Sequence, residues 1–138
     1  MKIYMFEADL YCGPCGEAIA ATLPAPDAWE REHPDSASHP VAYDSSEGQC
    51  DSPDHCGKCG LFLERELTEW GVRYVKEIVA EDLSTEIEIV GVVREWIDFY
   101  GIDAKDCVDD DVTYWREINE LPPLIVDRPA VSLSHTNH

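Results

Sequence analysis

The chain has 138 residues, which is enough for one compact domain and too few for two. Its 29 acidic residues against 10 basic ones give a formal net charge of −19, which opposes the phosphate neutralisation that nucleic-acid binding requires. No apolar run approaches the roughly 20 residues of a membrane-spanning helix, and the N-terminus lacks the basic start and the apolar stretch of a signal peptide. We therefore expect a cytoplasmic protein that binds neither nucleic acid nor membranes, whose six cysteines are metal ligands or redox thiols rather than disulfides.

The first third of the chain predicts a strand, a short helix and a long acidic loop. Residues 2–6 predict a short strand, and residues 16–23 predict a short apolar helix that ends before two prolines. Residues 24–54 are rich in Pro, Ser, Asp and Glu, so we expect a loop without regular structure. Because a loop of that length is unusual in a small domain, its ends must be fastened together, and Cys15 and Cys56 lie where this would happen.

Two amphipathic helices are predicted in the second half of the chain. Thr68 is a suitable N-cap for the first helix. The second helix is expected to begin at Thr85, which has capping-box spacing to a glutamate three residues later, and to end at Gly101. Residues 85–93 are also rich in β-branched side chains, so a strand is the alternative there. In the helical interpretation, residues 82–84 connect the two helices as an antiparallel hairpin.

The C-terminal part of the chain carries weaker signals. Residues 109–111 are consecutive aspartates, which indicate a solvated turn and a helix start, because calcium needs a fuller set of oxygen ligands. Residues 112–121 are a weak helix candidate, residues 124–126 predict a short strand, and residues 127–138 predict a loosely ordered tail. The tryptophans are expected to anchor the core and the loops: Trp29, Trp70, Trp96 and Trp115.

Two C-x-x-C units, each followed by glycine, are the most specific pattern in the sequence. Such a unit turns the chain tightly enough for both thiolates to reach one metal ion at about 2.3 Å, and glycine supplies the backbone angles that the turn needs. Two units offer four thiolates, which complete the tetrahedral coordination of a structural zinc ion and leave no position open for a catalytic water. The sequence therefore predicts a structural Zn²⁺ site formed by Cys12, Cys15, Cys56 and Cys59.

A redox dithiol is the alternative role for the first of these units. A strand, then C-G-P-C, then a helix is the arrangement in which thioredoxin- and glutaredoxin-like proteins present their dithiol. Tyr11 stands where thioredoxins usually have Trp, and too little chain follows Asp127 to supply the remaining elements of that fold. The second C-x-x-C would also have no role in this interpretation. No other catalytic motif is present in the sequence.

The remaining cysteines and histidines have weaker claims to a site. Cys50 and His55 lie beside the second C-x-x-C, so either is an alternative ligand, but four cysteines already saturate zinc. We expect Cys50 to be a free loop thiol and His55 to lie beside the site or at the surface. Cys107 is expected to be a small buried apolar residue, and His33 and His39 lack ligand spacing and are treated as surface residues.

Three stretches of the sequence carry a resemblance: "YCGPCGEAI", "CDSPDHCGKCGLFLERELTEWGVRYVKE" and "REWIDFYG". Together they resemble a group of small uncharacterised zinc-binding proteins of bacteria, phages and metagenomes, with a double C-x-x-C site like that of a zinc ribbon. The resemblance implies a zinc-binding module but no established activity. It implies metal ligation by Cys12, Cys15, Cys56 and Cys59, and a scaffold role for His55, Thr68, Gly71 and Tyr74.

These observations predict an α+β protein in which a zinc-ribbon-like double-knuckle site is joined to a helical hairpin. A single small domain is expected over residues 1–126, with the acidic loop inside it at 24–54 and the tail at 127–138. The predicted function is that of a non-enzymatic acidic zinc-binding module, a protein-interaction or regulatory factor whose partner is another, basic protein. The alternatives are a thiol oxidoreductase that uses Cys12 and Cys15, and a phage DNA mimic that inhibits a host protein.

Overall fold

The computed structural model describes residues 1–122, which contain both helices and strands and confirm the predicted α+β class. Contacts between Cα atoms divide the chain into two compact units, Met1–Leu67 and Thr68–His138, here called the N-terminal and the C-terminal unit. The boundaries of a single domain over residues 1–126 stay a prediction. The strand predicted at 124–126 and the tail predicted at 127–138 lie outside the described residues. In the described part of the chain, every helix is too short or too polar to cross a membrane.

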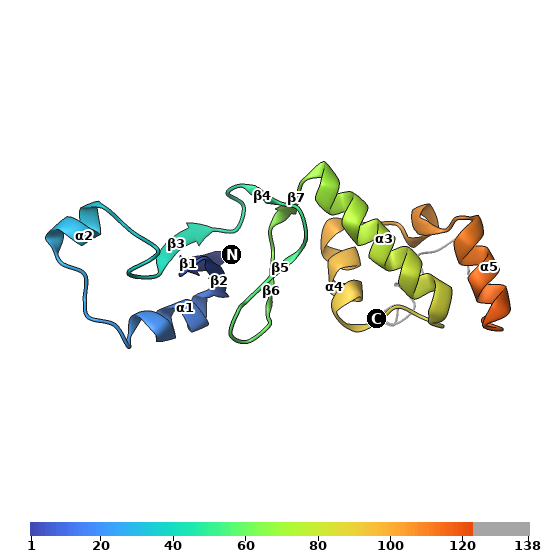
Figure 1. The fold of residues 1–138 in the computed structure, drawn as a ribbon, viewed down its shortest axis with the longest axis horizontal. Coiled ribbons are helices and arrows are strands. Elements are labelled where there is room, and N and C mark those ends of the chain that lie inside the picture. The colour runs from blue at the N-terminus through green and yellow to red at the C-terminus, as the bar shows by residue number, and fades with distance from the viewer. Residues whose placement is uncertain (123–138) are drawn as a thin grey trace, which may run out of the picture. The chain divides into compact units, whose positions relative to one another are not determined.

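The N-terminal unit is built on a three-stranded antiparallel sheet of order β2-β1-β3 (Figure 1). Its strands are β1 (Lys2–Phe6), β2 (Asp9–Cys12) and β3 (Val41–Asp44). The register places Ile3 of β1 opposite Cys12 on one side and Tyr43 on the other. The predicted strand over residues 2–6 is therefore confirmed, and it is the central strand of the sheet.

Helix α1 (Gly13–Ala20) follows β2 without a connecting loop and begins earlier than the predicted residue 16. Pro14 is tolerated in this first turn, because the N–H groups there need no helical partner and the fixed φ of proline suits a helix. Gly16 lets the helix approach the sheet, since a Cβ atom at this position would overlap the ring of Tyr4. The hydroxyl of Tyr4 also donates to the Glu17 carboxylate at 3.2 Å.

The prediction of an unstructured loop over residues 24–54 is wrong. This segment contains α2 (Ala28–Glu32), all of β3, and the short strand β4 (Gln49–Cys50). A capping box begins α2, in which the Glu30 N–H donates to the Asp27 carboxylate at 2.8 Å and the Asp27 N–H donates to Glu30 at 3.1 Å. The strand β3 is stabilised by pairing with β1, a contact between distant parts of the chain that composition does not reveal.

Two pairs of two-residue strands complete the N-terminal unit. The strand β4 pairs in parallel with β7 (Glu66–Leu67), and β5 (Asp54–His55) pairs antiparallel with β6 (Phe62–Leu63). The hairpin of β5 and β6 carries the second C-x-x-C unit in its loop, so the loop ends are held by backbone hydrogen bonds.

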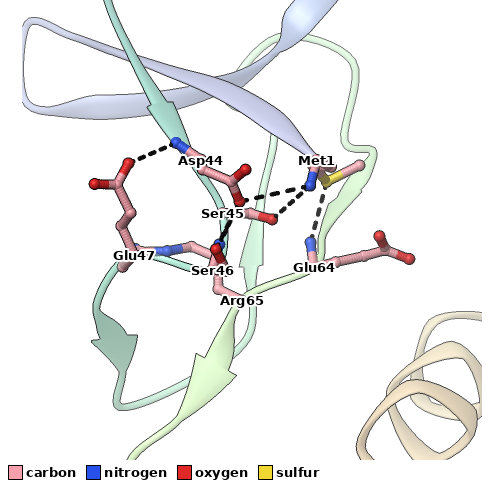
Figure 2. Close-up of polar contacts among 7 residues, drawn as sticks. All are labelled: Met1, Asp44, Ser45, Ser46, Glu47, Glu64 and Arg65. Atoms are coloured by element: carbon pink, nitrogen blue, oxygen red, sulfur yellow. Dashed lines mark hydrogen bonds and ion pairs between the residues drawn. The ribbon is translucent and has the colours of Figure 1, made fainter.

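Met1, the residue before β1, forms hydrogen bonds to two distant segments of the N-terminal unit (Figure 2). The amino group of Met1 donates to the hydroxyl of the buried Ser45 at 3.1 Å, and the Ser45 N–H donates back to the Met1 carbonyl at 2.8 Å. On the other side, the Glu64 N–H donates to the Met1 sulfur at 3.2 Å. These contacts join β1 to the turn after β3 and to the segment between β6 and β7.

The turn between β1 and β2 is strained, because Glu7 and Ala8 both have positive φ angles, of 49° and 63°. Two-residue hairpin turns with this geometry favour Asn and Gly, whose backbones tolerate it. We expect Ala8→Gly to raise the free energy of unfolding by about 1 kcal/mol, measured from the urea midpoint of the purified protein.

Ala18→Gly is the matched control for this turn. Ala18 is an exposed residue of α1, where glycine is expected to lower the free energy of unfolding by about 1 kcal/mol. A decrease of similar size for Ala8→Gly would contradict the strain at the turn.

The C-terminal unit is helical, with α3 (Glu69–Thr85) packed against α4 (Gly91–Tyr100), the 3₁₀ turn η1 (Ala104–Cys107) and α5 (Asp110–Ile118) (Figure 1). The predicted N-cap Thr68 is confirmed, since its hydroxyl accepts from the Gly71 N–H at 3.1 Å. The predicted end at Gly101 is also confirmed, with a left-handed φ of 65°. Asp109 caps α5 by accepting from the Val112 N–H at 2.9 Å, which confirms the aspartate run as a helix start.

The boundary between the two long helices differs from the prediction. Thr85 does not begin a helix, because its hydroxyl donates to the Glu81 carbonyl at 3.4 Å and the Ser84 hydroxyl to Ala80 at 2.8 Å, so both residues extend α3. Residues 82–84 therefore lie inside α3 and do not connect the helices. Residues 86–90 make the connection as neither helix nor strand, so the strand alternative is wrong as well. Gly91 begins α4 with a φ of 71°.

A buried arginine, Arg116, donates hydrogen bonds to carbonyl groups at the C-terminal end of α3. Arg116 of α5 is only 5% exposed, and its guanidinium donates to the carbonyls of Leu83 at 2.6 Å, Glu86 at 2.9 Å and Pro122 at 2.6 Å. Burial lowers the pKa of Arg116 from its ordinary value, but an arginine stays charged in proteins. The side chain supplies donors to carbonyl groups that a helix end leaves without partners.

The prediction for the tryptophans is confirmed only in part. Trp96 is buried among the apolar residues of the C-terminal unit, whereas the other three side chains are exposed: Trp29, Trp70 and Trp115. Cys107 is buried as predicted. An exposed indole contributes little to a core, so these three side chains need another explanation.

Candidate metal centre

The first C-x-x-C unit lies at the junction of a strand and a helix. Cys12 is the last residue of β2 and the N-cap of α1, and Cys15 belongs to the first turn of that helix. The change from extended to helical backbone at Cys12 produces the tight turn that brings the second thiol back toward the first.

The second C-x-x-C unit is the loop of the β5–β6 hairpin. Cys56 closes it from one side by donating its N–H to the Leu61 carbonyl at 2.8 Å, while the Gly60 N–H donates to the Cys56 carbonyl at 2.9 Å. Gly60 has a φ of 78°, which explains the glycine after Cys59. The Gly60 carbonyl accepts from Nδ1 of His55 at 2.9 Å, so this histidine supports the loop through the backbone.

A backbone hydrogen bond joins the two units. The N–H of Gly57, the residue after Cys56, donates to the carbonyl of Leu10 in β2 at 2.8 Å. A Cβ atom at this position would overlap the carboxylate of the exposed Asp9, so a larger residue would require that side chain to move.

The four sulfur atoms converge as the sequence predicts. The Sγ atoms of Cys12, Cys15, Cys56 and Cys59 all lie within 4.8 Å of one another. The Sγ atoms of Cys12 and Cys59, one from each unit, are 3.7 Å apart. In a tetrahedral site with metal–sulfur bonds of about 2.3 Å, two sulfurs are about 3.8 Å apart, whereas a disulfide requires about 2.05 Å. These cysteines can therefore hold a metal ion.

The site is half inside the core and half at the surface. Cys12 and Cys56 are 3% and 4% exposed and pack in one cluster with Ile3 and Leu63, while Cys59 is exposed. A metal bound by all four sulfurs would therefore connect the apolar core of the N-terminal unit to its surface loop.

The thiols do not ionise alike in the absence of a cation. Burial raises the pKa of Cys12. The pKa of Cys15 is raised to about 12, first by the hydrogen bond between its thiol and that of Cys12 and then by burial. Burial also opposes ionisation of Cys56, but N–H groups of Cys59, Cys12 and Lys58 point at its sulfur and lower the pKa to about 6. Packing four thiolates this closely is unfavourable without a positive charge among them, and a divalent metal supplies that charge.

The other candidate ligands lie elsewhere. Cys50 is part of β4 rather than a loop, and its thiol donates to the Glu66 carbonyl at 3.2 Å. Cys107 belongs to the C-terminal unit. Within residues 1–122, the four cysteines are the only group of at least three His, Cys, Asp or Glu side chains close enough to hold a metal.

One arrangement near the surface was not anticipated from the sequence. Trp29 and His33 stack on each other, although the sequence predicts an anchor of the core or of a loop at Trp29 and only a surface residue at His33. Their spacing of four residues around a capping box is the signal that would have placed them on one face of a helix.

Comparison with known proteins adds no assignment to this geometry. No protein-family model, no curated protein and no solved structure matches the chain. The suspected relationship to small double C-x-x-C proteins stays a prediction.

Proposed function

We propose that the four cysteines bind one zinc ion in a closed, zinc-ribbon-like structural site, and that the chain is a non-enzymatic binding module that acts through a basic protein partner. The observation that carries the proposal is the convergence of four sulfur atoms from two separate knuckles within 4.8 Å. Four thiolates saturate a tetrahedral zinc ion and leave no position for a substrate or an attacking water.

The metal would act as a structural cross-link. The ligands come from the β2–α1 junction and from the β5–β6 loop, which are separated along the chain by α2, β3 and β4. Structural zinc contributes an apparent binding free energy on the order of 10 kcal/mol or more in small peptides. The three-stranded sheet is small, so we expect the fold of the N-terminal unit to depend on this contribution.

A thiol oxidoreductase is less well supported by the same residues. The attacking cysteine of a C-x-x-C dithiol is usually accessible and has a lowered pKa. Cys12 is instead buried, and burial raises its pKa. Its sulfur also lies 3.7 Å from that of Cys59, so the second knuckle occupies the space that a disulfide substrate would need.

Metal analysis of the freshly purified full chain tests the proposal. We expect roughly one zinc per chain by mass spectrometry, and four thiols protected from a thiol reagent until a chelator is added. Cys50→Ser is the control, because it removes a thiol outside the cluster and should leave zinc content unchanged. A protein free of bound metal, with Cys12 and Cys15 cycling between dithiol and disulfide, would replace this proposal with the redox alternative.

A further inference from the structure

Residues 24–54, here called the acidic segment, line an open hollow of about 380 Å³ within the N-terminal unit. Its walls come from α2 and from the chain that leads to β3. Pro26, Pro34 and Pro40 line it, and their fixed φ angles limit the movement of the walls. The Glu7 N–H donates to the Ser36 carbonyl at 2.8 Å and ties this chain to the β1–β2 turn. The hollow is large enough for a long amino-acid side chain.

A stacked pair of rings forms one part of the wall. The rings of Trp29 and His33 are nearly parallel, at 16°, with centroids 4.2 Å apart. Nδ1 of His33 also donates to the Trp29 carbonyl at 2.9 Å, so the histidine is held in place. Despite this order, Trp29 is 65% exposed. An indole that is fixed in position and left in water is typical of a binding surface.

The charge around the hollow is negative. Glu30 and Asp35 line it together with one cationic side chain, Arg31, and residues 24–54 as a whole contain eight acidic residues against that single arginine. The guanidinium of Arg31 donates to the Pro26 carbonyl at 2.7 Å. The carboxylates of Glu30 and Asp35 each accept one backbone N–H, which leaves lone pairs for a further donor. Negative charge beside an exposed aromatic face favours a cation.

The C-terminal unit shows which cation this chain places on an exposed indole. There the guanidinium of Arg73 lies over the ring of Trp70, 4.6 Å from its centroid. Within residues 1–122, Trp29 has a comparable exposure, but no Lys or Arg side chain lies over its ring. A planar guanidinium stacks on an indole and donates in its plane to carboxylates, which suits Trp29 flanked by Glu30 and Asp35.

We propose that this hollow binds an arginine side chain of a basic partner protein, with the guanidinium stacked on Trp29 and donating to Glu30 and Asp35. The inference rests on the proposed function as a protein-interaction module and names the chemistry of the partner. It does not depend on direct contact with the metal centre.

The indole N–H signals of the full-length, metal-loaded protein provide the test. In heteronuclear NMR, a short glycine-flanked arginine peptide should shift the Trp29 signal with saturation, and should leave Trp115, which is 49% exposed, unshifted. The same peptide with citrulline, which keeps the shape but not the charge, should shift neither signal. Three results would overturn the proposal: a Trp29 shift of equal size with the citrulline peptide, a Trp115 shift as large as that of Trp29, or no shift of the Trp29 signal with the arginine peptide.

Variants of the hollow sharpen the test. Trp29→Ala should weaken binding of the peptide by roughly 2- to 5-fold or more, followed through the backbone signal of Asp35. Asp35→Asn should also weaken binding, because the amide still accepts the Ala37 N–H but has no charge. Trp115→Ala is the matched control and should change nothing. Tighter binding of free argininamide than of the peptide would assign the hollow to a small cation and overturn the protein partner.

Zinc analysis of the same samples separates this inference from the proposed function. Full zinc content with an unresponsive Trp29 would reject the arginine site alone. Absent zinc would reject the metal centre whatever the peptide does.

Discussion

Cys59→Ser is expected to release the metal and to unfold the N-terminal unit. Removing one of four thiolates opens the tetrahedral site, and most of the apparent binding free energy of structural zinc, on the order of 10 kcal/mol, would be lost to the fold. Cys59 is the best ligand to change because it is exposed, so serine there does not disturb the core. Zinc content, together with the dispersion of amide NMR signals from residues 1–67, measures both effects.

Cys50→Ser provides the comparison for this result. Cys50 is also a free thiol, lies close in sequence to the second knuckle and donates through its sulfur to the Glu66 carbonyl. A hydroxyl can replace that donor, so zinc content and signal dispersion should remain those of the unmodified chain. Equal loss of zinc in both variants would show that the ligand set differs from the four cysteines named above.

Arg116→Met is expected to lower the free energy of unfolding of the C-terminal unit by about 3 kcal/mol. The methionine keeps much of the apolar stem but leaves the carbonyls of Leu83 and Glu86 without their donors. Hydrogen bonds from a charged donor contribute about 1.5–3 kcal/mol, and a buried carbonyl that loses its partner costs about 1–3 kcal/mol. Urea unfolding followed by helical circular dichroism measures the change.

Arg73→Met is the matched control for the buried arginine. Arg73 is exposed and its main contact is the face of Trp70, so its replacement should cost about 0.5–1 kcal/mol at most. Similar losses for both variants would mean that the carbonyl contacts of Arg116 contribute little. Arg116→Lys should fall between the two, because one ammonium group cannot reach carbonyls that a planar fork spans.

The features predicted correctly depend on residues a few positions apart. Thr68 and Asp109 cap helices through hydrogen bonds to N–H groups three residues later, and Gly101 ends a helix through its own backbone conformation. Such interactions form within one segment, so the sequence reveals them directly. The capping box of Asp27 and Glu30 was equally local, and it was missed because the composition of residues 24–54 resembled that of a loop.

The features predicted wrongly depend on competition or on distant contacts. Thr85 has the sequence of a cap, but its hydroxyl bonds to Glu81 within the preceding helix instead. The end of that helix is then stabilised by Arg116, more than 30 residues later in the sequence. The strand β3 likewise forms because β1 offers it a free edge. A local pattern cannot decide which partner a group selects when a distant one is available.

The sequence by itself determined the local chemistry of this protein: two glycine-bearing C-x-x-C knuckles, a strongly acidic composition and three helix ends, at Thr68, Gly101 and Asp109. Only the tertiary structure decided how the two knuckles meet, through the hydrogen bond from Gly57 to Leu10 and the pairing of β5 with β6. It also decided that Trp29 stacks on His33 beside carboxylates. The physical reason is that ligand type and turn geometry are properties of a few residues, whereas convergence requires distant backbone groups to satisfy one another.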